Sequence, residues 1–249
     1  MIYLYDSTYD GFLSAIFEAF SRHETPDAIV SQMPEQIDFL QTFYKIETDP
    51  IHARRVEQGI LRAMGTDILS YVFAAMHSAE PHAGRDLLHF LRLGFQIGSA
   101  ILEHLTEESV VRVMRMSRHV WFESGKWREF LRFHELENGV YIAQYEPEND
   151  VTELMMPHFA DRFADQPFII HDRGRKKAGI YHHGSWMIAS SENMLLPSES
   201  EREAQYQKMW LCFYDTVAIK ARENPNLRRQ LMPKKFWKDM LEMNRTASS

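Results

Sequence analysis

The sequence has a single cysteine, no long apolar run and no basic leader. Cys212 cannot form an intramolecular disulfide, and its apolar neighbours predict that the thiol is buried. No stretch approaches the roughly 18 apolar residues of a membrane span. The first residues carry acids, Asp6 and Asp10, instead of the basic region of a signal peptide. We therefore expect a soluble, cytoplasmic protein with no membrane partner.

Patterns for phosphate loops and metal sites are also missing. Neither Gly-x-x-x-x-Gly-Lys-[Ser/Thr] nor Gly-x-Gly-x-x-Gly occurs, which argues against an ATPase or a dinucleotide enzyme. Twelve histidines are present, but none has a recognised zinc spacing such as His-Glu-x-x-His. The metal site that we considered and do not favour would use His158, His171, Asp172 and His182 or His183. We predict no metal and no cofactor.

The composition is that of a globular protein, with 45% hydrophobic and 25% charged residues in a chain of 249. Up to residue 125 the apolar residues recur mostly at helical spacing, between short strands expected at 2–5 and 41–46. Asp49 and Pro50 are typical of a helix start, because they supply an N-cap and a proline in the first turn. The first half is therefore predicted to be mostly helical.

A small sheet is predicted in the second half. Residues 129–145 alternate between polar and apolar around a turn at 137–139, which predicts a hairpin. A helix over 151–164 and strands near 168–172 and 181–189 follow. The predicted fold class is α+β, with a small antiparallel, ββαββ-like sheet packed by N-terminal helices and a long C-terminal helix.

The long C-terminal helix is expected to begin at Ser198 and to end at Glu223. Its buried stripe would consist of Tyr206, Trp210, Phe213 and Val217. No Gly/Ser/Pro-rich linker divides the chain, so residues 1–249 are expected to form one compact domain. That domain would have a helical subregion at 1–125 and a sheet-containing subregion at 126–249.

Positive charge is concentrated in residues 219–238, the basic segment. It holds seven Lys and Arg and one acid, giving +6, whereas the whole chain carries −7. Pro225 and Pro233 each begin a new helical turn, so we expect two helix N-termini that bind anions. The predicted nucleic-acid contacts are Arg222, Asn224, Arg228, Arg229, Lys234 and Lys235. Trp237 would either stack on a base or anchor the segment in the core, and a solvated amphipathic helix is the alternative.

A second anion site is predicted near the first hairpin strand. Arg132 and His134 lie on one face of that strand, and His158 and Arg162 are four residues apart on the next helix. If the helix packs across the sheet, these four side chains converge. The alternative is that Arg132 and His134 lie on the solvated face of the sheet.

His171 and Asp172, at the end of a hydrophobic strand, are the candidates for catalysis. A strand end holds side chains rigidly, which suits general acid–base chemistry, and an aspartate can fix the tautomer of a histidine. Neighbouring strand residues point to opposite faces, however. A structural or phosphate-orienting role is therefore favoured, and the sequence leaves open whether the protein is an enzyme.

A set of motifs runs along nearly the whole chain. They are Tyr3-x-Tyr5-Asp6 with Gly11-Phe12, Phe130-Leu-Arg-Phe133, His158-Phe159-x-x-Arg162-Phe163, Ile169-Ile-His-Asp172, Trp210, Arg222-x-Asn224-Pro225 and Met232-Pro233-Lys-Lys-Phe-Trp237. Together they resemble a bacterial family assigned to DNA metabolism and DNA repair, whose conserved region is a domain of unknown function. The chain departs from that family at Ser7-Thr8-Tyr9, where a compact Asp-Gly turn is usual.

The resemblance implies a role in DNA repair or modification. Members of the family typically accompany a radical S-adenosylmethionine protein distantly similar to spore photoproduct lyase, and some are fused to a uracil-DNA-glycosylase-like module. The leading hypothesis is a DNA-binding accessory or repair protein that acts with such a partner. The alternatives are a nuclease or glycosylase-like enzyme using His171 and Asp172, and an adaptor that docks an acidic protein without binding DNA.

Overall fold

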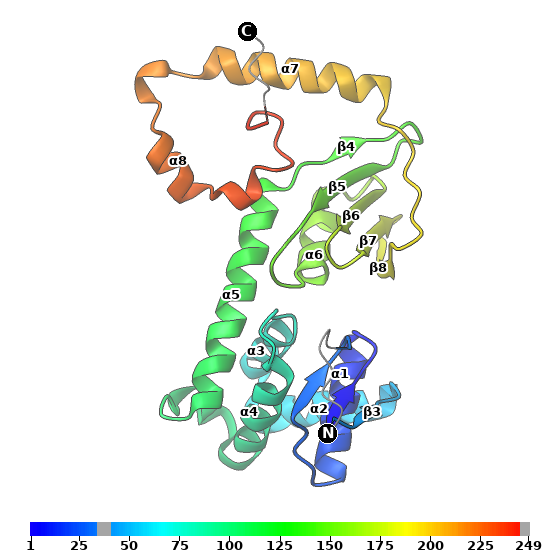
Figure 1. Cartoon of the computed structure of the whole chain (residues 1–249), viewed down its shortest axis with the longest axis vertical. Coiled ribbons are helices and arrows are strands. Elements are labelled where there is room, and N and C mark those ends of the chain that lie inside the picture. Colours follow the sequence, from blue (N-terminus) through cyan, green and yellow to red (C-terminus); the bar gives the residue numbers. More distant parts are fainter. Residues whose placement is uncertain (34–40, 245–249) are drawn as a thin grey trace. The chain divides into compact units, whose positions relative to one another are not determined.

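The computed structural model describes residues 1–33 and 41–244, and the chain divides into two compact units, Met1–Phe122 and Glu123–Ser249. Helices and two sheets are both present (Figure 1), which confirms the α+β prediction. The boundary between the units falls within one long helix, α5 (Glu108–Phe130). That the two units act as one domain stays a prediction.

The first unit is built on a three-stranded parallel sheet, in which β1 (Ile2–Leu4) lies between β2 (Ala28–Val30) and β3 (Phe43–Lys45). The strands expected at 2–5 and 41–46 are thus confirmed, and β2 was not anticipated. The helices are α1 (Tyr9–Ser21), α2 (Pro50–Met64), α3 (Thr66–Met76), α4 (Ala83–Ile97), the 3-10 helix η1 (Gly98–Glu103) and the first part of α5. Parallel strands require long crossovers, which α1 helps to supply.

Polar side chains fix where the first two helices begin. Asp49 accepts the backbone N–H of Ile51 at 2.8 Å, and Pro50 opens α2, as predicted. At α1, Thr8 is the N-cap and accepts the N–H of Gly11 at 2.9 Å. Asp6 in turn accepts the hydroxyl of Thr8 at 2.6 Å. Asp6 therefore organises the turn at which the chain departs from the family pattern.

The second unit contains a five-stranded sheet in the order β4-β5-β6-β7-β8. The strands are β4 (His134–Glu135), β5 (Tyr141–Tyr145), β6 (Phe168–Asp172), β7 (Lys177–His182) and β8 (Ser185–Ser190). The pairs are antiparallel except that β5 and β6 are parallel, because α6 (Thr152–Arg162) connects them as a crossover. The expectation of a wholly antiparallel sheet is wrong at that one pair.

The two faces of this sheet have different surroundings. Tyr145, Ile170 and Asp172 are buried on the face that α6 covers, where the Tyr145 hydroxyl bonds the Thr152 hydroxyl at 2.8 Å. Gln144 and His171 are register partners on the opposite face. Both are only half-buried, so this second face is the one from which polar side chains can reach a ligand.

The C-terminal part of the unit is helical, with α7 (Glu201–Val217), η2 (Lys220–Arg222), α8 (Pro225–Leu231) and η3 (Lys234–Phe236). The N-cap of α7 is Ser200, which accepts the N–H of Glu203 at 3.0 Å, rather than Ser198. The prediction that this helix packs its apolar stripe into the core is wrong. The four stripe residues are 40–57% exposed, namely Tyr206, Trp210, Phe213 and Val217. Cys212 is exposed as well.

The stripe is exposed because α7 lies beside the edge of the sheet and not on its face. Its contacts with the sheet are made at β4, where the Glu203 carboxylate accepts the backbone N–H of Glu135 at 2.9 Å. In Figure 1, α7 extends away from the strands towards α8. A strand of two residues offers too little apolar surface to cover a helix of this length.

Candidate functional site

The basic segment forms three short helical pieces. Asn224 caps α8 by accepting the N–H of Leu227 at 3.0 Å, and Pro225 opens the helix. The helix has seven residues, however, and Arg228 and Arg229 lie in its last turn and not its first. The expected anion-binding N-termini are therefore replaced by exposed cationic side chains.

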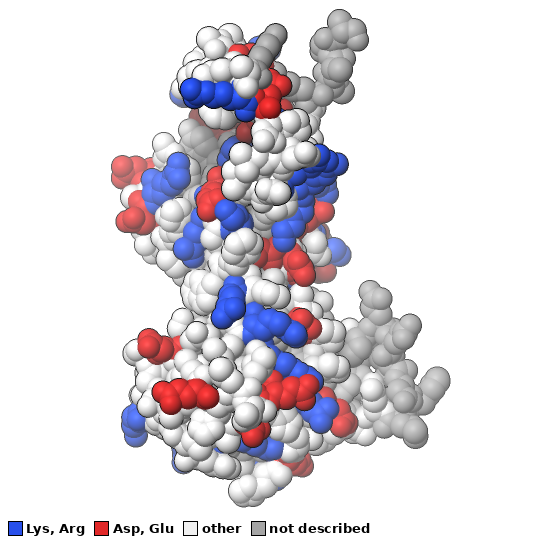
Figure 2. Space-filling model, turned by 90° about the vertical axis from the view of Figure 1, so that its left-hand side faces the viewer, with Lys and Arg blue, Asp and Glu red and all other residues white. Residues whose placement is uncertain are grey.

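The cations of the segment fall into two groups. Lys235 is bound by carboxylates, with Nζ 3.3 Å from Glu123 Oε1, and Lys238 Nζ lies 2.7 Å from Glu146 Oε1. The exposed cations without a carboxylate partner among the described residues are Arg222, Arg228, Arg229 and Lys234. In Figure 2, which looks at the side that α8 presents, Lys and Arg are intermixed with Asp and Glu. None of the described carboxylates therefore neutralises these four cations, and their charge is available to an anionic ligand.

Phe236 and Trp237 anchor the basic segment to the rest of the second unit. Phe236 is 3% exposed, and its ring centroid lies 4.6 Å from that of Trp127. Trp237 is half-buried, and its indole N–H donates to the Met232 carbonyl at 2.9 Å. The Arg228 guanidinium lies 5.6 Å from the Trp237 ring centroid. Trp237 thus positions Arg228, which favours the anchoring alternative over stacking on a base.

Glu123 is the buried carboxylate that joins this anchor to the sheet. It accepts the backbone N–H groups of Glu148 and Asn149 at 2.9 and 2.8 Å and the Asn149 amide at 2.7 Å. Lys235 completes the group. Burial alone would raise the pKa of Glu123, but these donors outweigh it and hold that pKa below its usual range. The carboxylate therefore fixes where the basic segment lies.

Arg132 and His134 do not join His158 and Arg162 in one pocket. Arg132 pairs with the largely buried Glu242 at 3.3 Å, and His134 lies 3.4 Å from a Glu203 carboxylate oxygen. Arg132 lies between α5 and β4, and β4 itself, which holds His134, contacts α7, whereas α6 packs on β6, β7 and β8. The expected four-residue site is therefore not formed.

Arg128 takes the place that the sequence assigned to Arg132. Burial lowers the pKa of His158, and the nearby guanidinium groups of Arg128 and Arg162 lower it further. Arg128 donates to the Leu154 carbonyl at 2.5 Å, while its buried Nε has no partner among the described residues. Arg128 lies in α5, directly before residues 129–145, over which a hairpin was predicted. The helical spacing of Trp127 and Leu131 was the sequence signal that could have placed Arg128 on a helix.

His171 and Asp172 point to opposite faces of the sheet, as the alternation of a strand requires. Asp172 is fully buried and binds Arg175, whose Nη1 lies 3.1 Å from Oδ2 and whose backbone N–H lies 3.1 Å from Oδ1. Burial raises the pKa of Asp172 even though Arg175 opposes it. Asp172 therefore closes the turn between β6 and β7, and its hydrogen bonds go to Arg175 rather than to His171.

His171 has polar partners at both ring nitrogens. Nε2 lies 3.0 Å from Ser191 Oγ, and Nδ1 lies 3.3 Å from the side-chain amide nitrogen of Gln144. Burial lowers the pKa of His171, Arg173 lowers it further, and Asp172 raises it. The imidazole is therefore neutral at physiological pH. Ser191 was not among the residues that the sequence singled out, because nothing in its local pattern marks it.

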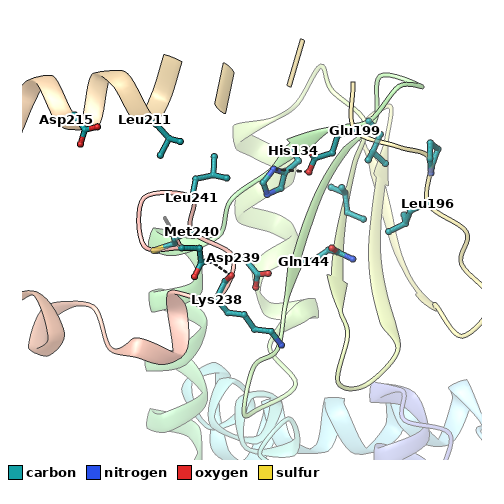
Figure 3. A pocket seen from close by; sticks show the side chains of 14 residues that line it. His134, Gln144, Leu196, Glu199, Leu211, Asp215, Lys238, Asp239, Met240 and Leu241 are labelled. Carbon is teal, nitrogen blue, oxygen red and sulfur yellow. Dashed lines mark hydrogen bonds and ion pairs between the residues drawn. The ribbon is translucent and has the colours of Figure 1, made fainter. Parts of the chain in front are cut away.

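A pocket of about 970 Å³ opens over this face of the sheet (Figure 3). Its lining includes Gln144 and Ile142 of β5, Leu211 of α7, and Met240, which follows the basic segment. Its charged lining residues are Glu199, Asp215, Lys238 and Asp239. Acids outnumber bases there, so the pocket favours uncharged or cationic ligands over phosphate.

Metal and membrane sites are not found in the part of the chain that the structure describes. Within residues 1–33 and 41–244, no three His, Cys, Asp or Glu side chains group closely enough to hold a metal ion. Of the helices described, none is long and apolar enough to cross a membrane.

Fold and site together define an α+β protein with an exposed basic helical segment and a pocket over one face of a sheet. A family model described as a domain of unknown function, DUF4130, matches residues 81–242, about two thirds of the chain. The protein therefore belongs to this family. No curated protein and no solved structure is significantly similar to it.

Proposed function

We propose that the protein is a cytoplasmic DNA-binding accessory or repair protein, and that the basic segment binds DNA phosphates. The observation that carries this proposal is the set of four exposed cations in a chain of net charge −7: Arg222, Arg228, Arg229 and Lys234. Charge concentrated on one surface of an acidic protein favours a localised polyanion over indiscriminate binding. Lys235 contributes less, because Glu123 and Glu148 already neutralise it.

The exposed aromatic face of α7 favours single-stranded over double-stranded DNA. Tyr206 and Phe213 are 54% and 57% exposed, and Trp210 is 40% exposed. Unpaired bases stack on such rings with little regard to sequence, at roughly 1–3 kcal/mol each, whereas a duplex hides its base faces. Rings on α7 and cations on α8 would supply the two contacts that single strands need.

Arg128 and Arg162 support a second phosphate contact within the same unit. Both guanidinium groups lie close enough to His158 to lower its pKa, whereas Asp161 raises it. Arg132 is left out of this contact because Glu242 already pairs with it.

The partner enzyme in this proposal is a radical S-adenosylmethionine protein, and the family resemblance supports it. The accessory protein would present DNA to that enzyme. Co-expression of the two proteins tests this: we expect them to co-purify, and a partner that stays separate with and without DNA argues against it.

Fluorescence anisotropy with a labelled single strand and its duplex, at near-physiological salt, tests DNA binding. We expect the single strand to bind more tightly, and Phe213→Ala to weaken that binding about 5- to 150-fold, since one stacking contact is worth roughly 1–3 kcal/mol. Phe122→Ala is the matched control, because Phe122 is also an exposed helical phenylalanine, 66% exposed on α5. If neither the single strand nor the duplex binds, the proposal is contradicted.

The same α7 face supports a second candidate function, that of a protein-docking adaptor. Met209, Phe213 and Val217 are each more than half exposed, and Leu231 of α8 is 63% exposed. Apolar groups clustered in this way are typical of interaction surfaces. An adaptor would co-purify with a protein partner and show no affinity in the anisotropy assay.

A further inference from the structure

Three polar side chains centred on His171 are arranged like a nucleophile, a general base and a group that orients the base. Ser191 Oγ lies 3.0 Å from Nε2 of His171, and the Gln144 amide lies 3.3 Å from Nδ1. Turning the amide about its last side-chain bond places Oε1 where it would accept Nδ1–H. Nε2 is then unprotonated and faces the serine hydroxyl. An imidazole held in this way activates a serine for nucleophilic attack.

We propose that Ser191 and His171 form a nucleophile–base pair for hydrolysis of an uncharged carboxylic ester, with Gln144 as the positioning residue. This inference rests on the sheet and its pocket, and it does not depend on DNA binding. It replaces the pairing of His171 with Asp172, because Asp172 is buried on the other face with Arg175.

The class of substrate follows from the pocket. Gln144 contacts His171 and also lines the pocket, so His171 and Ser191, which are not lining residues themselves, lie directly behind Gln144. Glu199, Asp215 and Asp239 outnumber Lys238, which disfavours a phosphate or carboxylate ligand. The apolar lining residues include Ile142, Leu196, Leu211 and Met240, which suit an acyl chain.

The reaction proceeds in two balanced steps. Oγ of Ser191 forms a bond to the carbonyl carbon while its proton passes to Nε2 of His171. The bond to the alkoxide oxygen then breaks, and Nε2 returns the proton to the leaving alcohol. Water attacks the acyl-serine in the same manner, giving the acid and restoring the hydroxyl.

The surroundings of the pair fit this role. Burial and the neighbouring Arg173 lower the pKa of His171, against the opposing effect of Asp172, so the base is unprotonated at neutral pH. Ser191 is 8% exposed and thus buried, whereas its neighbour Ser190 is exposed. A reagent that selects by accessibility reaches Ser190 first, and a reagent that selects by activation reaches Ser191.

The test is labelling of the full-length protein with an alkyl fluorophosphonate, with the modified residue located by peptide mass spectrometry. We expect a phosphonyl adduct on Ser191 and not on Ser190. Labelling should be lost in Ser191→Ala, unchanged in Ser190→Ala, and at least about 100-fold slower in His171→Gln, because general bases typically contribute that factor.

A second variant covers the case in which His171→Gln does not fold. Gln144→Leu leaves both reacting groups in place, so labelling should persist but slow, and its pH midpoint should fall as the imidazolium loses an acceptor. Circular dichroism checks that each variant is folded. Three outcomes overturn the proposal: no adduct on Ser191, equal adducts on Ser190 and Ser191, or unchanged labelling in a folded His171→Gln protein.

Discussion

Glu123 is the residue on which the geometry of the basic segment depends most. Its two carboxylate oxygens accept three bonds from the 148–149 turn and contact Lys235, while the neighbouring Phe236 packs on Trp127. A sequence predicts none of this, because a glutamate inside a helical pattern has the signature of a solvated residue. Satisfying a buried carboxylate requires donors from a distant turn, and only the folded chain brings them together.

Glu123→Gln should lower the free energy of unfolding by roughly 2–3 kcal/mol, because an amide group would face N–H donors and one of the two carboxylates that pair with Lys235 would be lost. Urea denaturation followed by circular dichroism measures the change. Glu129→Gln is the matched control on the same helix: Glu129 pairs with Lys126 at the surface, so we expect less than about 0.5 kcal/mol. Equal effects for the two variants would show that Glu123 has no special role.

The stabilisation by Glu123 should also depend on pH in a defined direction. Its pKa in the folded protein is below the unfolded value of 4.5, so the stabilisation is fully present above pH 4.5. It is lost as the pH falls through the folded pKa. The difference in unfolding free energy between the native protein and Glu123→Gln should therefore shrink from pH 6 to pH 3. A difference that grows on acidification contradicts the assignment.

At the scale of elements, α5 shows how a local signal can mislead. Gly125 and the alternation after it predicted an end to the helices, yet α5 runs through Gly125 to Phe130. The helix continues because Trp127 and Leu131 recur at helical spacing and are buried. The predicted start of α2 and the predicted end of β6 were more accurate, because Pro50 marks a helix start and the apolar run before Asp172 marks a strand.

Two glycines in helices should respond to alanine in opposite directions. A methyl group at Gly125 would meet nothing within 4 Å, so Gly125→Ala should stabilise by roughly 0.5–1 kcal/mol through helix propensity. At Gly84 the methyl group would overlap the backbone of Ile29, where α4 crosses β2. Gly84→Ala should therefore destabilise by roughly 1–3 kcal/mol. Urea denaturation of both variants checks the signs, and the same sign for both contradicts the packing described.

The exposure of α7 is the largest difference between expectation and structure. Residues 206, 210, 213 and 217 have the spacing of a buried stripe, and the spacing itself is correct. The sequence predicts an apolar stripe, but it does not show which surface, if any, the stripe packs against. Within its unit, α7 meets the two-residue strand β4 and the C-terminal segment, so its rings remain available to a ligand or partner.

At the scale of the whole molecule, the distribution of charge along the chain could be predicted from the sequence. Which side chains distant in the sequence come into contact could not. The contrast between a +6 segment and a −7 chain is visible in the sequence. The division of those cations into exposed and paired groups depends on Glu123, Glu146 and Glu148, which lie about 90 to 110 residues away in the chain. The pairing of His171 with Ser191 likewise joins β6 to the residue that follows β8, a strand that is not a neighbour of β6 in the sheet.

The central claim is that exposed cations of the basic segment contact DNA phosphates, and the salt dependence of binding tests it most directly. For Arg228→Ala plus Arg229→Ala, the slope of log affinity against log salt should fall in magnitude by about 1.4 on single strands and about 1.8 on duplex. Arg54→Ala plus Arg55→Ala removes the same charge from adjacent exposed positions of α2 and should leave the slope unchanged. Equal slopes for the native protein and both double variants would contradict the claim.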